Sequence, residues 1–176
     1  MNNKLELTQR DIFKNLDGLI IEKSHFYPLK IYYEDTDTGS IVYHSNYLKY
    51  FERARSSLLN LLEINQLKIK KNEGIFLVAK KATIDWHNPA QLNDTIIIET
   101  RLKYAKNSSI TIEHEAYKYY ESKKKFDLLV SGTVQIVAID NNFRVKRIKL
   151  ILKNNFFLAN KCNWLINRGM KQWLQK

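Results

Sequence analysis

Residues 31–55 are IYYEDTDTGSIVYHSNYLKYFERAR, an acidic turn followed directly by an amphipathic segment. Apolar residues recur in this segment at intervals of three and four, namely at Tyr47, Phe51, Ala54, Leu58 and Leu61 or Leu62. The spacing predicts a helix over residues 46–64, and Ser45 or Asn46 is a suitable N-cap residue. Further leucines widen the apolar face, which is typical of a helix covered by other elements.

The acidic turn places carboxylates immediately before this helix. Asp35 and Asp37 lie two positions apart, and Gly39 follows them. A carboxylate here lies beside free backbone N–H groups and the positive end of the helix dipole, which can hold a reactive oxygen next to a developing oxyanion. From the local sequence alone, an ordinary turn or capping aspartate is the simpler interpretation of Asp37, because aspartate is common in turns.

After a lysine-rich linker the pattern changes from helical to alternating. The alternation predicts four strands, over residues 75–86, 95–104, 109–120 and 127–139. Short polar connections between the last three indicate antiparallel neighbours. Weaker patterns predict a short helix that ends near Gly18, a first strand over residues 26–34 and a short strand around residues 143–149. One early helix followed by long strands predicts an α+β domain whose antiparallel sheet wraps around the helix.

The composition excludes several functional classes. Hydrophobic residues make up 44% of the chain, and no apolar run approaches the roughly 18–20 residues that span a bilayer. The N-terminus lacks the pattern of a signal peptide, so a cytoplasmic location is expected. The single cysteine, Cys162, cannot form an intrachain disulfide, and the four scattered histidines lack the spacing of a zinc site, so no metal is expected.

The net charge of +11 has two interpretations. It is either a solvated lysine-rich surface or an attraction to an anionic partner, such as nucleic acid, membrane phosphate or a phosphorylated cofactor. No RNA-binding signature accompanies the charge, which argues against nucleic acid. Residues 150–176 combine aromatic and basic residues. They are expected to form either a packed terminal helix or a basic amphipathic helix in peripheral contact with an anionic membrane.

The pattern around the turn resembles the hotdog-fold acyl-CoA thioesterases, most closely the YbgC-type branch of the group named for 4-hydroxybenzoyl-CoA thioesterase. The shared elements are two aromatic residues with Glu-Asp-Thr-Asp, a turn glycine, Val-Tyr-His, Asn-Tyr and Glu-Arg-Ala-Arg, here residues 32–37, Gly39 and residues 42–44, 46–47 and 52–55. Residues 85–94, DWHNPAQLND, resemble a second element of the family. The resemblance covers residues 26–148, and it departs at Ser40, where many members have glycine.

The resemblance implies a hotdog fold over residues 26–149, with an N-terminal extension of residues 1–25 and a basic amphipathic C-terminal extension of residues 150–176. It also implies hydrolysis of an acyl-CoA thioester to free acid and CoA. Coenzyme A would enter as part of the substrate, so no separate cofactor is expected. The family further implies a homodimer or homotetramer. A non-catalytic module of the same fold, which binds acyl groups or a membrane-associated partner, is the alternative function.

The resemblance also assigns roles to residues of the turn. It implies that Asp37 is catalytic, either as nucleophile or as general base for water, and that the backbone N–H of His44 stabilises the oxyanion. The imidazole of His44 contacts the substrate, orients Asp37 or merely closes the turn. Tyr43, Asn46 and Tyr47 are expected to bind substrate.

Other titratable residues receive structural interpretations. Asp35 is expected to support the turn, and His114 is expected to be a hydrogen-bonded core histidine because it lies on an apolar strand face. Glu52 is expected to form an ion pair with Arg53, Arg55 or a neighbouring subunit. The resemblance also makes it a minor catalytic candidate, because some hotdog thioesterases carry their catalytic carboxylate on the central helix.

Overall fold

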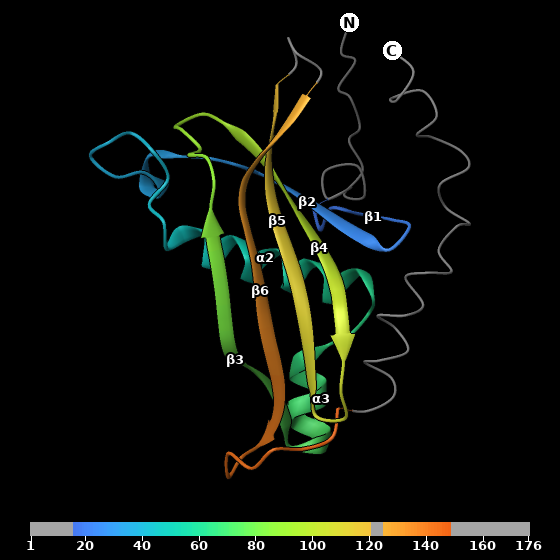
Figure 1. Ribbon diagram of the computed structural model, residues 1–176. Coiled ribbons are helices and arrows are strands. Elements are labelled where there is room, and N and C mark those ends of the chain that lie inside the picture. Colours follow the sequence, from blue (N-terminus) through green and yellow to red (C-terminus); the bar gives the residue numbers. More distant parts are fainter. Residues whose placement is uncertain (1–15, 121–124, 149–176) are drawn as a thin grey trace, which may run out of the picture.

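The computed structural model describes residues 16–120 and 125–148 (Figure 1). In chain order the elements are β1 (Leu19–Ile21), β2 (Ser24–Lys30), the 3₁₀ helix η1 (Tyr33–Asp35), α2 (Asn46–Leu61), α3 (Gln66–Glu73), β3 (Ile75–Trp86), β4 (Thr95–Ala105), β5 (Ser109–Tyr120) and β6 (Lys125–Asp140). None of the helices in this part of the chain combines the length and the hydropathy that a membrane span requires.

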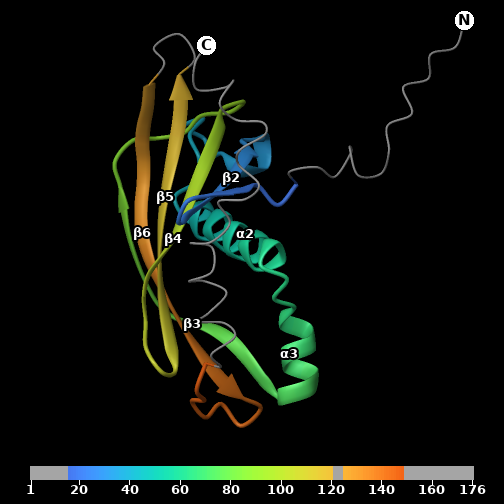
Figure 2. The same ribbon diagram turned by 90° about the vertical axis from the view of Figure 1, so that its right-hand side faces the viewer.

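The six strands form one antiparallel sheet in the order β1-β2-β4-β5-β6-β3. Figure 2 shows this sheet from the side, curved around α2, which lies against one of its faces. The arrangement confirms the predicted α+β class and the hotdog fold, in which a sheet wraps around a central helix. β3 is the last strand of the sheet, and among the described residues it pairs only with β6.

The predictions for the central helix and the four long strands are confirmed, with small differences at the ends. The helix ends at Leu61 because the chain reverses just after it. There the Leu62 N–H still donates to the Leu58 carbonyl oxygen, and Glu63 adopts a left-handed φ of +57°.

The predicted strand over residues 26–34 is wrong at both ends, because β2 begins at Ser24 and ends at Lys30. The chain leaves the sheet at that end because the next residues turn into η1. The Asp35 carboxylate accepts a hydrogen bond from the Tyr32 N–H at 2.9 Å, which stabilises this turn.

The predicted helix that ends near Gly18 is also wrong in its described part, where β1 follows Gly18 directly. Gly18 has a φ of +77°, and a Cβ atom there would lie 2.2 Å from the carbonyl oxygen of Phe26. Glycine therefore lets the chain turn tightly onto β2, and the apolar residues after it enter the sheet. The residues before position 16 lie outside the described part of the chain.

The lysine-rich linker contains a helix, α3, that the hydrophobic pattern did not indicate. Asn65 caps its start by accepting a hydrogen bond from the Lys68 N–H at 2.9 Å, and Gly74 ends it with a φ of +63°. None of the residues of α3 is buried, so the helix has no apolar stripe. Only its two caps were available as a signal.

The ends of the predicted domain differ from the sheet in detail. β1 and the start of β2 belong to the sheet, although they fall within the N-terminal extension predicted for residues 1–25. The short strand predicted around residues 143–149 is reduced to a single bridge between Ile139 and Val145. The predicted C-terminal extension, residues 150–176, lies outside the described residues.

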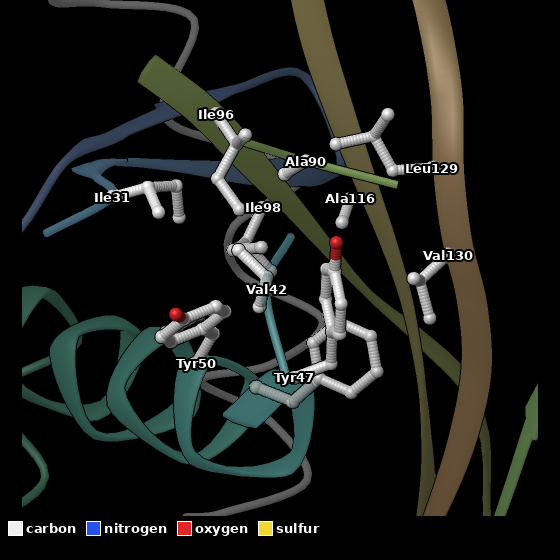
Figure 3. Packing of buried hydrophobic residues seen from close by; sticks show 12 residues of the cluster. Ile31, Val42, Tyr47, Tyr50, Ala90, Ile96, Ile98, Ala116, Leu129 and Val130 are labelled. Carbon is white, nitrogen blue, oxygen red and sulfur yellow. The ribbon is translucent and has the colours of Figure 1, made fainter. Parts of the chain in front are cut away.

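The core lies between α2 and the sheet (Figure 3). Tyr47, Tyr50 and Phe51 of α2 are its largest fully buried side chains. They pack with Ile31, Val42, Ala54, Ala90, Ile96, Ile98, Ala116, Leu129 and Val130. Gly132 of β6 lies under the helix, where a Cβ atom would be 2.9 Å from the Thr83 carbonyl oxygen and 3.2 Å from the Phe51 ring.

A chain of buried polar groups crosses this core. Arg55 Nη1 lies 3.1 Å from Nε2 of His114, and Nδ1 of the same ring lies 3.1 Å from the Thr100 hydroxyl. Because a guanidinium only donates, Nε2 accepts and the ring is neutral. This confirms that His114 is a hydrogen-bonded core histidine, and its ring stacks on Phe51 at 4.7 Å. Arg55 also forms the predicted ion pair with Glu52.

The environment of two buried histidines makes the fold sensitive to acid. Burial and the Arg55 charge hold the pKa of His114 well below its ordinary value of 6.5. Burial also lowers the pKa of His25. Each histidine therefore binds a proton in the unfolded chain at a pH at which it is still neutral in the fold. Stability from these groups is complete above pH 6.5 and is lost as the pH falls below it.

We predict that His114→Gln weakens this pH dependence, because it removes one of the two groups. The free energy of unfolding of the wild type is expected to fall as the pH drops below 6.5. The slope for the variant is expected to be smaller by up to about 1.4 kcal/mol per pH unit. Urea unfolding of both proteins from neutral to mildly acidic pH measures the two slopes, and equal slopes would contradict the assignment.

Candidate active site

The acidic turn is a small hairpin that leads into α2. Thr36 and Val42 form an antiparallel bridge, and the Asp37 N–H donates to the Ile41 carbonyl oxygen at 3.0 Å. The Ser40 N–H closes the turn by donating to the Asp37 carbonyl oxygen, also at 3.0 Å. Ser40 has a φ of +59°, in the left-handed region that favours glycine. The serine therefore keeps the turn geometry that a glycine would adopt more easily.

The Asp37 side chain is exposed on this hairpin. Its Oδ1 accepts a hydrogen bond from the Gly39 N–H at 2.7 Å, which fixes the orientation of the carboxylate. A Cβ atom at residue 39 would lie 3.0 Å from the same oxygen, so glycine leaves room for it. Within the described residues Oδ2 has no hydrogen-bond partner. One oxygen is held in place and the other is available to water or a substrate.

Asp35 ties the hairpin to its surroundings. It is only 7% exposed, and its carboxylate accepts the Tyr32 N–H. Its carbonyl oxygen accepts two hydrogen bonds, both at 2.9 Å, from the Tyr43 N–H and from Nδ2 of Asn46. These contacts join the start of the hairpin, its end and the first turn of α2. They support the structural role expected for Asp35.

His44 lies at the end of the hairpin, between two aromatic rings. The centroid of its imidazole is 4.5 Å from that of Tyr43 and 5.9 Å from that of Trp86. Nε1 of Trp86 donates to the His44 carbonyl oxygen at 3.3 Å, which links the end of β3 to the hairpin. All three side chains are exposed. No hydrogen bond joins the imidazole to Asp37 in the described part of the chain.

The start of α2 holds the remaining predicted site residues. Ser45 occupies the N-cap position but makes no side-chain capping bond, and the side chain of the buried Asn46 donates to the hairpin instead. Tyr47 is 2% exposed, and its ring lies in the apolar cluster beneath the helix. Its buried hydroxyl faces the Ala90 backbone but makes no hydrogen bond of good geometry among the described residues. Nor is an acceptor found there for the backbone N–H of His44, which is therefore available to a ligand.

Two small cavities lie beneath α2. One, of about 10 Å³, is lined by residues that include His25 and Thr100. The other, of about 60 Å³, lies between α2 and β3, with Glu52, Arg55 and Leu77 in its wall. No residue of the hairpin lines either cavity. Asp37 itself is exposed on the surface of the single chain.

A metal centre is not indicated in residues 16–120 and 125–148, where no histidine, cysteine or acidic residues are grouped to hold an ion. Trp86 is not among the site residues predicted from the sequence, although it contacts His44. It is 52% exposed at the end of β3, directly before the His-Asn-Pro-Ala break. The sequence signal that could have identified Trp86 is its position in residues 85–94, the second element that resembles the family.

Comparison with known proteins identifies the family of the chain. A family model described as the thioesterase-like superfamily matches residues 32–156. The acyl-CoA thioesterase YbgC of Haemophilus influenzae is 31% identical over 121 residues, which cover 69% of this chain and 85% of that protein. The acyl-CoA thioester hydrolase YbgC of Escherichia coli O6:H1 is 34% identical over 114 residues, which cover 65% of this chain and 81% of that protein.

Solved structures show the same fold. A probable thioesterase from Bartonella henselae has a TM-score of 0.62 at 27% identity, covering 72% of this chain and 99% of that one. A 4-hydroxybenzoyl CoA thioesterase mutant complexed with 4-hydroxybenzoyl CoA has a TM-score of 0.68 at 17% identity, and the match covers 74% of this chain and 97% of that one. At the lower identity the likeness concerns the fold alone.

We predict that Tyr47→Phe does not destabilise the protein, because the buried hydroxyl it removes makes no hydrogen bond of good geometry among the described residues. The free energy of unfolding is expected to stay unchanged or to rise by up to about 1 kcal/mol. Chemical denaturation measures it. A higher KM at unchanged stability would instead assign the hydroxyl to substrate binding. A clear loss of stability would show that the hydroxyl is hydrogen-bonded to the Ala90 backbone in the folded protein.

Proposed function

Because the chain belongs to the thioesterase-like superfamily, we propose that it hydrolyses acyl-CoA thioesters to free acid and CoA. The observation that carries the proposal is the Asp37 carboxylate, which has one oxygen held by the Gly39 N–H and the other open. The two YbgC relatives, which are an acyl-CoA thioesterase and an acyl-CoA thioester hydrolase, support the choice of substrate class, since the chain covers most of each of them.

The chemistry of a thioester suits so simple a site. The leaving group is a thiolate, and the pKa of a free thiol is only about 8.5, so a strong general acid is less necessary than in amide hydrolysis. The reaction needs a positioned oxygen and stabilisation of the tetrahedral oxyanion. Oδ2 of Asp37 would supply the first, either by attacking the thioester carbon as nucleophile or by taking a proton from the attacking water as general base.

The backbone N–H of His44 is the proposed oxyanion donor. It lies just before α2, where the positive end of the helix dipole also favours negative charge. The imidazole makes no hydrogen bond to Asp37 within the described residues, so in this proposal it contacts the substrate instead, together with the exposed ring of Tyr43. Asn46 and Tyr47 are buried, and they would act by holding the hairpin and the helix behind the substrate.

The site is proposed to be completed by a second subunit, in a homodimer or homotetramer. β3 contains 12 residues and leaves one side unpaired within the described chain, and residues 79–83 at its middle are exposed. Long exposed edge strands are normally covered or paired, because their free N–H and C=O groups invite pairing. The open surface around Asp37 would then gain a wall from the partner.

This proposal requires no separate cofactor, because coenzyme A arrives with the substrate. A cytoplasmic location is proposed with it. Peripheral membrane contact through residues 150–176 stays a prediction, since those residues lie outside the described part of the chain. A non-catalytic acyl-binding module is the second candidate, favoured by the lack of hairpin residues in the two cavities and opposed by the free oxygen of Asp37.

We predict that Asp37→Asn lowers kcat on the order of 10²–10³-fold while the fold persists. The amide oxygen of asparagine can still accept the Gly39 N–H, so the turn is preserved and only the reactive oxygen is lost. Release of free CoA from short-chain, long-chain and aromatic acyl-CoAs measures turnover.

Glu34→Gln is the matched control, because Glu34 is an exposed carboxylate three residues earlier in the same segment. Its turnover is expected to equal that of the wild type. Full activity in Asp37→Asn would remove Asp37 from the mechanism. A wild type that is inactive on every acyl-CoA tested would favour the binding module.

We also predict that light scattering gives a mass of at least two chains. Ala82→Asp places a charge at the exposed middle of β3 and is expected to shift the mass toward one chain and to lower kcat/KM. Tyr104→Asp, at an exposed position of the interior strand β4, serves as the control and should leave the mass unchanged. A monomeric, fully active wild type would contradict a site shared between subunits.

A further inference from the structure

One end of the molecule exposes apolar side chains among cations. It is formed by α3 and by the turn after β6, which lie at the same end in Figures 1 and 2. The pairing of Ile75 with Asp140 joins the two parts. We call residues 66–73 and 140–147 the basic tip. The tip lies at the start of β3, whereas His44 and the proposed active site lie beside Trp86 at its other end, about 36 Å away along the strand.

The charge of the basic tip is positive. The tip contains six cationic side chains and two carboxylates, which give a net charge of +4. All six cations are exposed, and they are Lys68, Lys70, Lys71, Arg144, Lys146 and Arg147. Lys146 is paired with Asp140 at 3.0 Å, and Lys70 lies 5.4 Å from the centre of the Phe76 ring. The tip as a whole attracts anions.

The basic tip also carries three of the most exposed large apolar side chains in the described part of the chain. Leu67 is 79% exposed, Phe143 is 78% exposed and Val145 is 62% exposed. The Phe143 ring contacts that of Phe76 in a T-shaped arrangement, at 6.5 Å between ring centres, and otherwise it is largely exposed. Exposed apolar side chains surrounded by polar residues are a common feature of interaction sites.

The turn holds Phe143 outward at a conformational cost. Its φ is +59°, where a bulky side chain is disfavoured and glycine or asparagine is usual. The Asp140 carboxylate fixes the turn by accepting the N–H groups of Asn142 and Arg144, at 2.9 and 3.0 Å. Because Phe143 is not buried, packing in the fold does not offset this cost. The conformation therefore leaves an aromatic ring exposed at the surface of the tip.

We propose that the basic tip docks on a bilayer that contains anionic phospholipids. The positive charge matches the phosphate headgroups, and Phe143, Leu67 and Val145 match the apolar layer beneath them. A hydrated polyanion such as RNA would satisfy the cations but would leave the leucine and the valine exposed. The combination of the two chemistries therefore selects a lipid surface.

The test uses the full-length chain and sedimentation with vesicles. The wild type is expected to bind vesicles of phosphatidylcholine with about one third phosphatidylglycerol, and not vesicles of phosphatidylcholine alone. Phe143→Asn introduces a residue that tolerates the left-handed conformation of the turn, so the melting temperature is expected to be unchanged or higher. Because the aromatic ring is lost, vesicle binding is expected to weaken on the order of fivefold. Arg144→Gln with Arg147→Gln is expected to weaken binding at least about tenfold.

Phe126→Asn is the matched control, because Phe126 is 53% exposed near the opposite end of β6. It should bind vesicles like the wild type. Unchanged binding in both tip variants would overturn the proposal and would assign membrane contact to another segment. Absence of vesicle binding by the wild type would overturn it as well, and charge-dependent RNA binding would then indicate a nucleic-acid partner. Turnover of a short-chain acyl-CoA without vesicles should be equal in all variants, which separates this result from the proposed hydrolysis.

Discussion

The burial of one face of α2 fixes the position of the hairpin that carries Asp37. Tyr47, Phe51 and Ala54 lie on that face and are almost completely excluded from solvent by the sheet. Because the helix cannot turn or slide without exposing them, its first residue has a fixed place. The hydrogen bonds of Asp35 then fasten the preceding hairpin to that place. The exposed Asp37 carboxylate is therefore held in place by a turn that is itself anchored to the buried core.

The same helix carries a polar connection that a purely apolar core would not need. Arg55 is 8% exposed and touches both Glu52 and His114, and the ring of His114 also meets Thr100 on β4. A buried guanidinium is costly without partners, so these groups depend on one another. The connection fixes the rotation of α2 relative to β4 and β5 more specifically than apolar contacts do, because its hydrogen bonds require particular distances and directions.

The sequence predicted best those helices and strands whose buried residues recur at regular spacing. The helix that begins at Asn46 and the long strands are visible because each buries one face along its whole length. α3 has no buried residue, and the end of β2 is set by the Asp35 carboxylate, so neither followed from periodicity. The Asp37 turn was recognised through family resemblance, because locally it is an ordinary turn. Trp86 joins His44 only through tertiary structure, which a linear pattern does not report.

Gly132 shows how little separates the two layers of this domain. The backbone of β3 on one side and the Phe51 ring on the other leave no room for even a methyl group at that position. Alanine there would have to push the central helix outward or open the pairing between β3 and β6. Either movement would reach the hairpin through the rigid body of the helix. The missing Cβ of Gly132 therefore sets the spacing between helix and sheet, and through the helix it influences where the Asp37 carboxylate lies.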